Sequence, residues 1–138
     1  MTAATLTIAN ALKALVADAF PAVGFATAGT PETAVQAKSL PAGLRPPCVL
    51  ILAGDGGYTD STLTRRQLFH LILIDKLKGH GDTRAASAWT QFDTLQALFP
   101  QDGVEVGGTV FLPESFRVLE CADNRAAACL TVAAVTSA

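Results

Sequence analysis

The most continuous hydrophobic pattern in the chain runs from Leu68 to Ile74, where only His70 interrupts a series of Leu, Ile and Phe side chains. A short apolar run between turn-forming residues is typical of a strand that is covered on both faces, in the middle of a sheet. Cys48–Ala53, CVLILA, is a second apolar segment. We expect the two to form a hairpin whose tip, Gly54–Thr62, is polar and rich in glycine.

Two segments carry apolar residues at helical spacing. The first, Thr5–Phe20, has Ile8, Leu12, Leu15, Val16 and Ala19 on one stripe. The second, Thr83–Phe99, has Ala85, Ala88, Trp89, Phe92, Leu95, Leu98 and Phe99 on a broad stripe, with Asp82 placed as the N-cap. We expect Trp89, Phe92 and Phe99 to be buried, which makes this second helix the anchor of the sheet.

The remaining segments predict short strands and one long irregular region. Strands are expected at Val23–Ala28, Val104–Leu112 with a turn or bulge at Gly107-Gly108, Ser115–Cys121 and Ala128–Val135. The proline-rich region 29–47 is expected to pass around the sheet, with a brief helix beginning at Pro31. This order predicts a single α+β domain, residues 1–138, with one mixed or antiparallel sheet of about four to six strands and two main helices on one face.

The opposite face of the predicted sheet is expected to lack a helical layer. Its strands are nevertheless apolar, so a neighbouring copy of the chain is the simplest cover. The composition points the same way, because charged residues make up only 16% of the chain, against about 25% in a typical soluble domain. We therefore expect a subunit that hides part of its surface against other subunits.

Charge and cysteine usage exclude several classes of function. The net charge is −2 with ten Lys and Arg, so we expect no basic stripe for gripping nucleic acid. Cys48, Cys121 and Cys129 have no metal-ligand or disulfide spacing, and the GDGGYTD segment lacks a phosphate-binding motif. We expect no metal and no cofactor. No secretory signal or membrane span is recognisable, which favours the cytosol as the place of synthesis and assembly.

Few residues are candidates for chemistry. His70, alone among aliphatic residues, is most simply a neutral core or interface histidine, and Arg65-Arg66 a solvated or intersubunit pair. The alternative is a small enzyme or ligand-binding domain in which His70 or His80 acts with Asp75 or Asp82 as an acid–base pair. Asp75 and His80 flank a glycine-rich turn, so such a pair would be poorly preorganised. We therefore expect a protein that is not an enzyme.

The order of elements, together with LRPPCVLILAGDG and RRQLFHLILIDKLKGHGDTRAASAWTQFDTLQALF, resembles the tail-terminator or tail-completion proteins of long-tailed bacteriophages, the head-to-tail joining group of Mu-like phages. That family begins with an amphipathic helix, followed by a proline-led apolar strand, a second strand ending in a polar turn, and a long helix. The likeness covers about residues 5 to 100. It rests on a pattern of strands and helices and brings no catalytic residues with it.

The resemblance implies a virion structural protein that forms a ring, typically of six subunits, on the completed tail tube. Such a ring ends tail polymerisation, joins the tail to the neck and head-completion proteins, and lets DNA pass through its lumen without specific binding. A related tail-tube or neck adaptor subunit is the alternative. We expect strands Cys48–Ala53 and Leu68–Asp75 to wall the ring, and Gly29–Leu44 and Gly54–Thr62 to reach the tube or the next subunit. The candidate contact residues are Tyr58, Arg65, Arg66, Phe69, His70, Leu71, Leu73 and Asp75.

Overall fold

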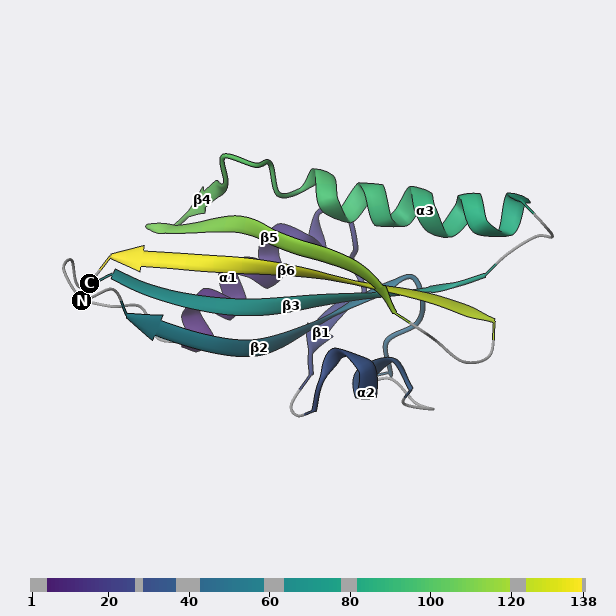
Figure 1. Cartoon of the computed structure of the whole chain (residues 1–138), viewed down its shortest axis with the longest axis horizontal. Coiled ribbons are helices and arrows are strands. Elements are labelled where there is room, and N and C mark those ends of the chain that lie inside the picture. Colours follow the sequence, from purple (N-terminus) through teal and green to yellow (C-terminus); the bar gives the residue numbers. More distant parts are fainter. Residues whose placement is uncertain are drawn as a thin grey trace.

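The computed structural model describes residues 5–26, 29–36, 43–58, 64–77, 82–119 and 124–137 (Figure 1). The elements are, in chain order, α1 (Thr5–Ala17), β1 (Val23–Phe25), α2 (Pro31–Val35), β2 (Cys48–Tyr58), β3 (Thr64–Lys76), α3 (Asp82–Ala97), β4 (Val104–Val106), β5 (Thr109–Leu119) and β6 (Arg125–Ser137). The strands form one sheet in the order β1-β2-β3-β6-β5-β4. β1 is parallel to β2 and every other neighbouring pair is antiparallel, so the sheet is mixed and the predicted α+β class is confirmed.

β3 lies inside the sheet, paired with β2 on one side and with β6 along its whole length on the other. Its side chains alternate between the two faces of the sheet. Leu71 and Leu73 on one face and Ile72 and Ile74 on the other are completely buried. The prediction of a central strand covered on both sides is therefore confirmed.

The two long helices pack on the same face of the sheet, as predicted. Ile8, Leu12 and Val16 of α1 join Phe92 and Leu95 of α3 in one core with the side of β3 that carries Leu71. The expected burial of Trp89 is wrong, because its side chain is 62% exposed. At 3.6 residues per turn Trp89 lies about 100° around the helix from the buried Ala88, and the part of α3 that touches the sheet is narrower than the apolar stripe.

The opposite face is not bare, and in this respect the prediction is wrong. α2 lies in front of the sheet in Figure 1, whereas α1 lies behind it. Val35 of α2 and Leu44 pack on Cys48, Ile72 and neighbouring apolar residues of this second face. The brief proline-led helix predicted near Pro31 is thus present. Reciprocal hydrogen bonds between Thr30 and Thr33 cap its start.

Several strand boundaries differ from the prediction. β2 continues through the glycine-rich segment to Tyr58, with a bulge between Ala53 and Gly56, while residues 59–62 of the expected tip lie outside the described residues. β5 continues through Pro113 with another bulge, so the two strands predicted on either side of it are one. The turn at Gly107-Gly108 is confirmed, with φ of 58° and 84°, values that a tight hairpin turn requires. None of the helices within these ranges has the length and hydrophobicity needed to cross a membrane.

Candidate functional site

Three of the predicted contact residues lie together at the far end of the β2–β3 hairpin. Tyr58 stands directly opposite Arg65, and Gly57 opposite Arg66. Tyr58 is 73% exposed. Together with Arg66 and Leu68 it borders an open depression of about 300 Å³. This end of the hairpin therefore combines an exposed aromatic ring with the side chains of two arginines.

Both arginines already have partners within the chain. Arg66 forms an ion pair with Glu114, which lies in the bulge of β5. Arg65 donates hydrogen bonds to the hydroxyl of Thr5 at the start of α1 and, at 3.3 Å, to the amide oxygen of Gln67. These contacts tie the hairpin to its neighbours, and they favour a structural role for the pair over a free anion-binding site.

Four of the predicted contact residues are buried by the chain itself. Phe69, Leu71, Leu73 and Asp75 are between 0 and 3% exposed. They share the face of β3 on which α1 and α3 pack. The Asp75 carboxylate accepts a hydrogen bond of 2.8 Å from the backbone N–H of Lys76. A second subunit therefore has no access to these side chains, and of the eight predicted residues only Tyr58, Arg65, Arg66 and the half-buried His70 are accessible.

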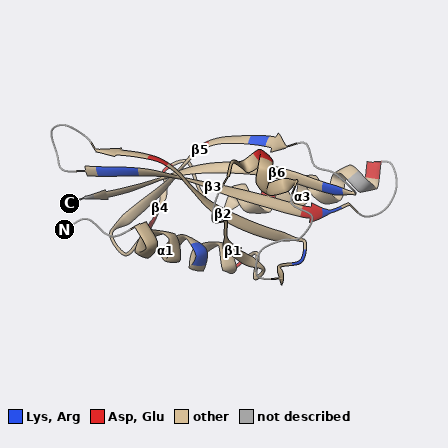
Figure 2. Cartoon of the chain, turned by 90° about the horizontal axis from the view of Figure 1, so that it is seen from below, with Lys and Arg blue, Asp and Glu red and all other residues tan. Residues whose placement is uncertain are grey.

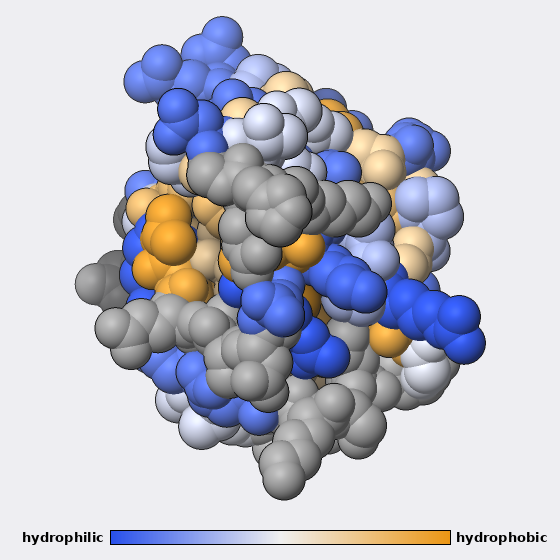
Figure 3. Space-filling view, turned by 90° about the vertical axis from the view of Figure 1, so that its right-hand side faces the viewer, coloured by the Kyte–Doolittle hydropathy of each residue, from blue (hydrophilic) through white to orange (hydrophobic). Residues whose placement is uncertain are grey.

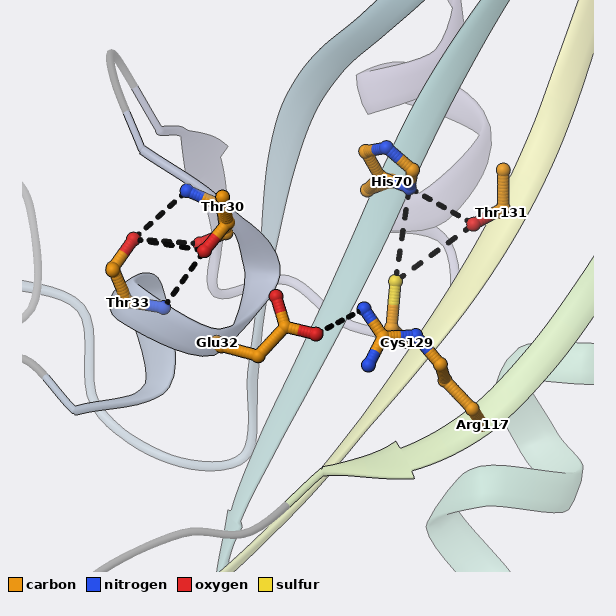
Figure 4. Close-up of polar contacts among 7 residues, drawn as sticks. All are labelled: Thr30, Glu32, Thr33, His70, Arg117, Cys129 and Thr131. Carbon is orange, nitrogen blue, oxygen red and sulfur yellow. Dashed lines mark hydrogen bonds and ion pairs between the residues drawn. The ribbon is translucent and has the colours of Figure 1, made fainter.

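His70 lies on the other face of β3, in a small polar cluster (Figure 4). Its Nδ1 is 2.9 Å from the hydroxyl of Thr131, the residue directly opposite on β6. The thiol sulfur of Cys129 lies 3.9 Å from each of these two atoms. Histidine next to cysteine is also the arrangement of cysteine nucleophiles, so the protonation states decide what this pair can do.

Burial keeps both groups of the cluster uncharged. It lowers the pKa of His70, with the positive charge of Arg117 as a weaker second cause, and it raises the pKa of the Cys129 thiol. An activated cysteine needs the opposite shift, toward the thiolate. His70 and Asp75 lie on opposite faces of β3, so they form no acid–base pair, and His80 lies outside the described residues. The cluster is therefore best understood as satisfied polar packing.

An ion pair beside this cluster joins α2 to the sheet. The Arg117 guanidinium on β5 contacts the Glu32 carboxylate on α2 (Figure 4). A backbone hydrogen bond, and secondarily Arg117, lowers the pKa of Glu32. Both side chains are about half exposed, so the pair orients α2 more than it stabilises the fold. In the part of the chain that the structure describes, no three His, Cys, Asp or Glu residues gather as metal ligands.

The outer strands leave two open edges that the sequence analysis did not identify. β1 pairs only with Val49–Ile51, so the outer edge of β2 from Ala53 to Tyr58 has no strand partner among the described residues. β4 pairs only with Thr109–Phe111, so the outer edge of β5 from Glu114 to Leu119 likewise has none within the described ranges. Each open segment contains a bulge, between Ala53 and Gly56 in β2 and at Glu114 in β5. Most residues of the two open segments are exposed.

Exposed apolar side chains lie near both open edges. Leu6 of α1 borders a depression that Ala53 of β2 also lines, and it is 64% exposed. Near the β5 edge, Val118 and Trp89 are 66% and 62% exposed. Phe92 of α3 packs edge-on against Phe116 of β5 at 5.8 Å, which brings the Trp89 turn toward this edge. The end of the molecule at which β5 finishes shows hydrophobic groups at its surface among hydrophilic ones (Figure 3).

Comparison with known proteins adds no relative. A scan against models of protein families gives no match, and a search of curated proteins gives none either. The likeness to tail-terminator proteins therefore rests on the sequence pattern alone.

Proposed function

We propose that the protein is a structural subunit that assembles head to tail into a closed ring, and that this ring caps a bacteriophage tail tube, ends its polymerisation and joins it to the neck. One observation carries the assembly: a single sheet with two unlike open edges on opposite sides. The viral context comes from the resemblance in the sequence. On this proposal the subunit assembles in the host cytoplasm and becomes part of the virion.

Unlike edges on opposite sides of a sheet favour a heterologous contact. In such a contact each copy uses one surface toward the preceding neighbour and another toward the next, and rotation about an axis closes the series into a ring. A two-fold dimer would instead require one self-complementary patch. The exposed apolar residues are divided between the β2 edge and the β5 edge, which supports two separate contact surfaces.

The contact area needed is compatible with the size of the chain. An obligate interface buries about 2,000 Å² or more over both partners. A ring subunit makes two such contacts, so it would bury roughly a quarter of its 7634 Å² surface. A strand edge alone is too small for this, and we therefore expect α1 and α3, which lie next to the open edges, to contribute.

The charge distribution supports a lumen through which DNA slides. The net charge is −2, and charged residues are scattered over the described part of the molecule without a basic stripe (Figure 2). Proteins that hold DNA tightly neutralise its phosphates with clustered Lys and Arg. A weakly charged lumen avoids that attraction. The proposed partners are further copies of the chain, the tail-tube protein and the neck or head-completion proteins, with DNA as a passing molecule.

Electron microscopy of the purified protein tests the proposal directly. We expect annular particles with a central hole, together with a mass several times 14.3 kDa by light scattering, and hexamers as the commonest state. Added to polymerising tail-tube subunits, the protein should shorten the tubes and sit at one end of each. Compact monomers at every concentration, with no effect on tube length, would refute the function. Open filaments of this chain would support the head-to-tail contact but favour the tail-tube alternative.

A further inference from the structure

An apolar groove lies next to the open edge of β2. It has a volume of about 350 Å³ and is lined mainly by apolar side chains from α1, from the end of β1 and from β2, among them Leu6, Ala9, Phe25 and Ala53. A groove beside an unpaired strand edge fits an added strand: the backbone pairs with the edge and alternate side chains enter the groove. An occupant must therefore be extended and apolar on one face.

The open segment of β5 meets this requirement. Val118 stands opposite Ala128 in the sheet register, and Ala128 belongs to the core under α1 and α3. Val118 therefore points to the helix-covered face, the same face on which the groove lies. If a second copy continues the sheet, its side chains keep their faces. Its Val118, with Trp89 of the adjacent α3, then lies on the groove side.

The strand directions are also compatible. β2 is antiparallel to β3, β3 to β6, and β6 to β5, so β2 and β5 run in opposite directions within one copy. A second copy that continues the sheet with the same face forward brings its β5 antiparallel to β2 of the first. Antiparallel neighbours are the more stable pairing per residue. Both open segments are six residues long, from Ala53 to Tyr58 and from Glu114 to Leu119.

Each edge carries one exposed charged residue that is opposite in sign to one on the other edge, Asp55 on β2 and Arg117 on β5. Asp55 is exposed on the β2 edge and makes no ion pair within the described residues. Arg117 on the β5 edge remains 51% exposed while it contacts Glu32. A guanidinium has five N–H donors, so Arg117 of one copy retains donors for Asp55 of the next.

We infer that ring assembly occurs by strand addition, in which the open edge of β5 in one copy pairs antiparallel with the open edge of β2 in the next, and Val118 and Trp89 enter the groove beside Leu6. The inference rests on the proposed self-assembly and names the two surfaces that carry it. It also explains why four large apolar groups, Leu6, Tyr58, Trp89 and Val118, are exposed on a single copy.

Trp89 makes the contact directly measurable, because it is the single tryptophan of the chain. At 62% exposure it should emit at long wavelength in the dilute monomer. As concentration rises, emission should move to shorter wavelength in step with the increase in mass by light scattering. Val118→Glu on one edge, or Leu6→Glu at the groove, should abolish both changes. Thr94→Glu, at an exposed position about 140° around α3 from Trp89, is the charge-matched control and should leave both unchanged.

Mixing the two variants tests the head-to-tail geometry. Val118→Glu keeps an intact β2 edge and Leu6→Glu keeps an intact β5 edge. An equimolar mixture should therefore form dimers, whereas each variant alone stays monomeric. Circular dichroism on each variant verifies folding, which we expect to be kept because both positions are about two-thirds exposed. A mixture that stays monomeric would overturn the inference.

The proposed function and this contact can fail separately. If annular particles form but the emission of Trp89 does not change, or if either Glu variant still forms rings, the function stands and the contact lies elsewhere. If the unaltered protein stays monomeric at every concentration and leaves tube length unchanged, the function itself is refuted, and the strand-addition contact falls with it.

Discussion

Phe92 and Trp89 lie three residues apart on α3, and the structure predicts very different costs for removing them. Phe92 is 5% exposed and packs edge-on against Phe116 with ring centroids 5.8 Å apart. A buried Phe→Ala substitution costs about 3–5 kcal/mol of unfolding free energy, including the cavity it leaves. Of this, the edge-to-face pair accounts for about 0.5–1.5 kcal/mol. Trp89→Ala removes a larger side chain that is 62% exposed, and such surface changes stay within about 0.5 kcal/mol.

Urea unfolding followed by far-UV circular dichroism compares Phe92→Ala and Trp89→Ala with the unaltered chain, at a concentration low enough for the monomer. With a typical urea slope of about 1–3 kcal/mol per M, the loss of about 3–5 kcal/mol in Phe92→Ala should lower the midpoint by about 1–5 M. Trp89→Ala should leave the midpoint nearly unchanged. Equal losses in the two variants, or a larger loss for Trp89→Ala, would show that the assigned packing of α3 is wrong.

Three further predictions concern single positions. Gly103 has φ +90°, and a Cβ there would lie 2.7 Å from a neighbouring side chain. Gly103→Ala should therefore lower the unfolding free energy by about 2–5 kcal/mol in the same urea titration. Gly108, at φ +84° with open space around it, is the control, and Gly108→Ala should lower the unfolding free energy by only about 1–2 kcal/mol. Burial raises the pKa of the Cys48 thiol to about 11 and also raises the pKa of the Cys129 thiol, so little of the reactive thiolate forms at mildly alkaline pH. After treatment with an alkylating reagent, peptide mapping should find both cysteines unmodified in the folded protein and modified in urea. Burial lowers the pKa of the His70 imidazole, so the unfolded chain takes up a proton at this residue at a higher pH than the folded chain does. The contribution of His70 to the unfolding free energy should therefore be complete above the unfolded pKa of about 6.5 and decrease as the pH falls below it. A chain with His70→Gln that kept the same decrease would contradict this.

The hydrophobic pattern of the sequence was sufficient to predict the elements with the most buried side chains. The central strand could be predicted because Leu71 to Ile74 are apolar without interruption, and a short run of this kind between turn-forming residues is typical of a strand covered on both faces. The helices that cover one face could also be predicted, because Leu12 of α1, and Phe92 and Leu95 of α3, each belong to an apolar stripe at helical spacing. At Trp89 the same spacing failed, since periodicity gives the direction of a side chain but not the width of the surface that covers it.

The cover of the second face depended on a segment that carries little pattern. α2 has five residues, too few for a periodic signal, and its position comes from Val35 and Leu44 packing on the sheet. Residues 29–47 therefore looked like a loop that could contact another subunit. Part of this region covers its own sheet instead. Four of the predicted contact residues on β3 are buried for a related reason, because the sequence does not state which face of the strand the helices cover.

The open edges were harder still to predict, because they depend on differences in strand length. A strand edge is free only where its neighbour stops, and here β1 and β4 stop after three residues each, while β2 and β5 extend to eleven. Each of the unpaired parts also contains a bulge, after Ala53 in β2 and after Pro113 in β5, and a bulge bends a strand locally. Natural proteins usually protect exposed edges against chance pairing. Here an exposed apolar residue, Val118, lies at the open edge. This combination favours a strand edge that binds another protein surface. Since α1 and α3 cover one face of the sheet and α2 covers part of the other, the edges are the surfaces that we propose for contact with neighbouring subunits.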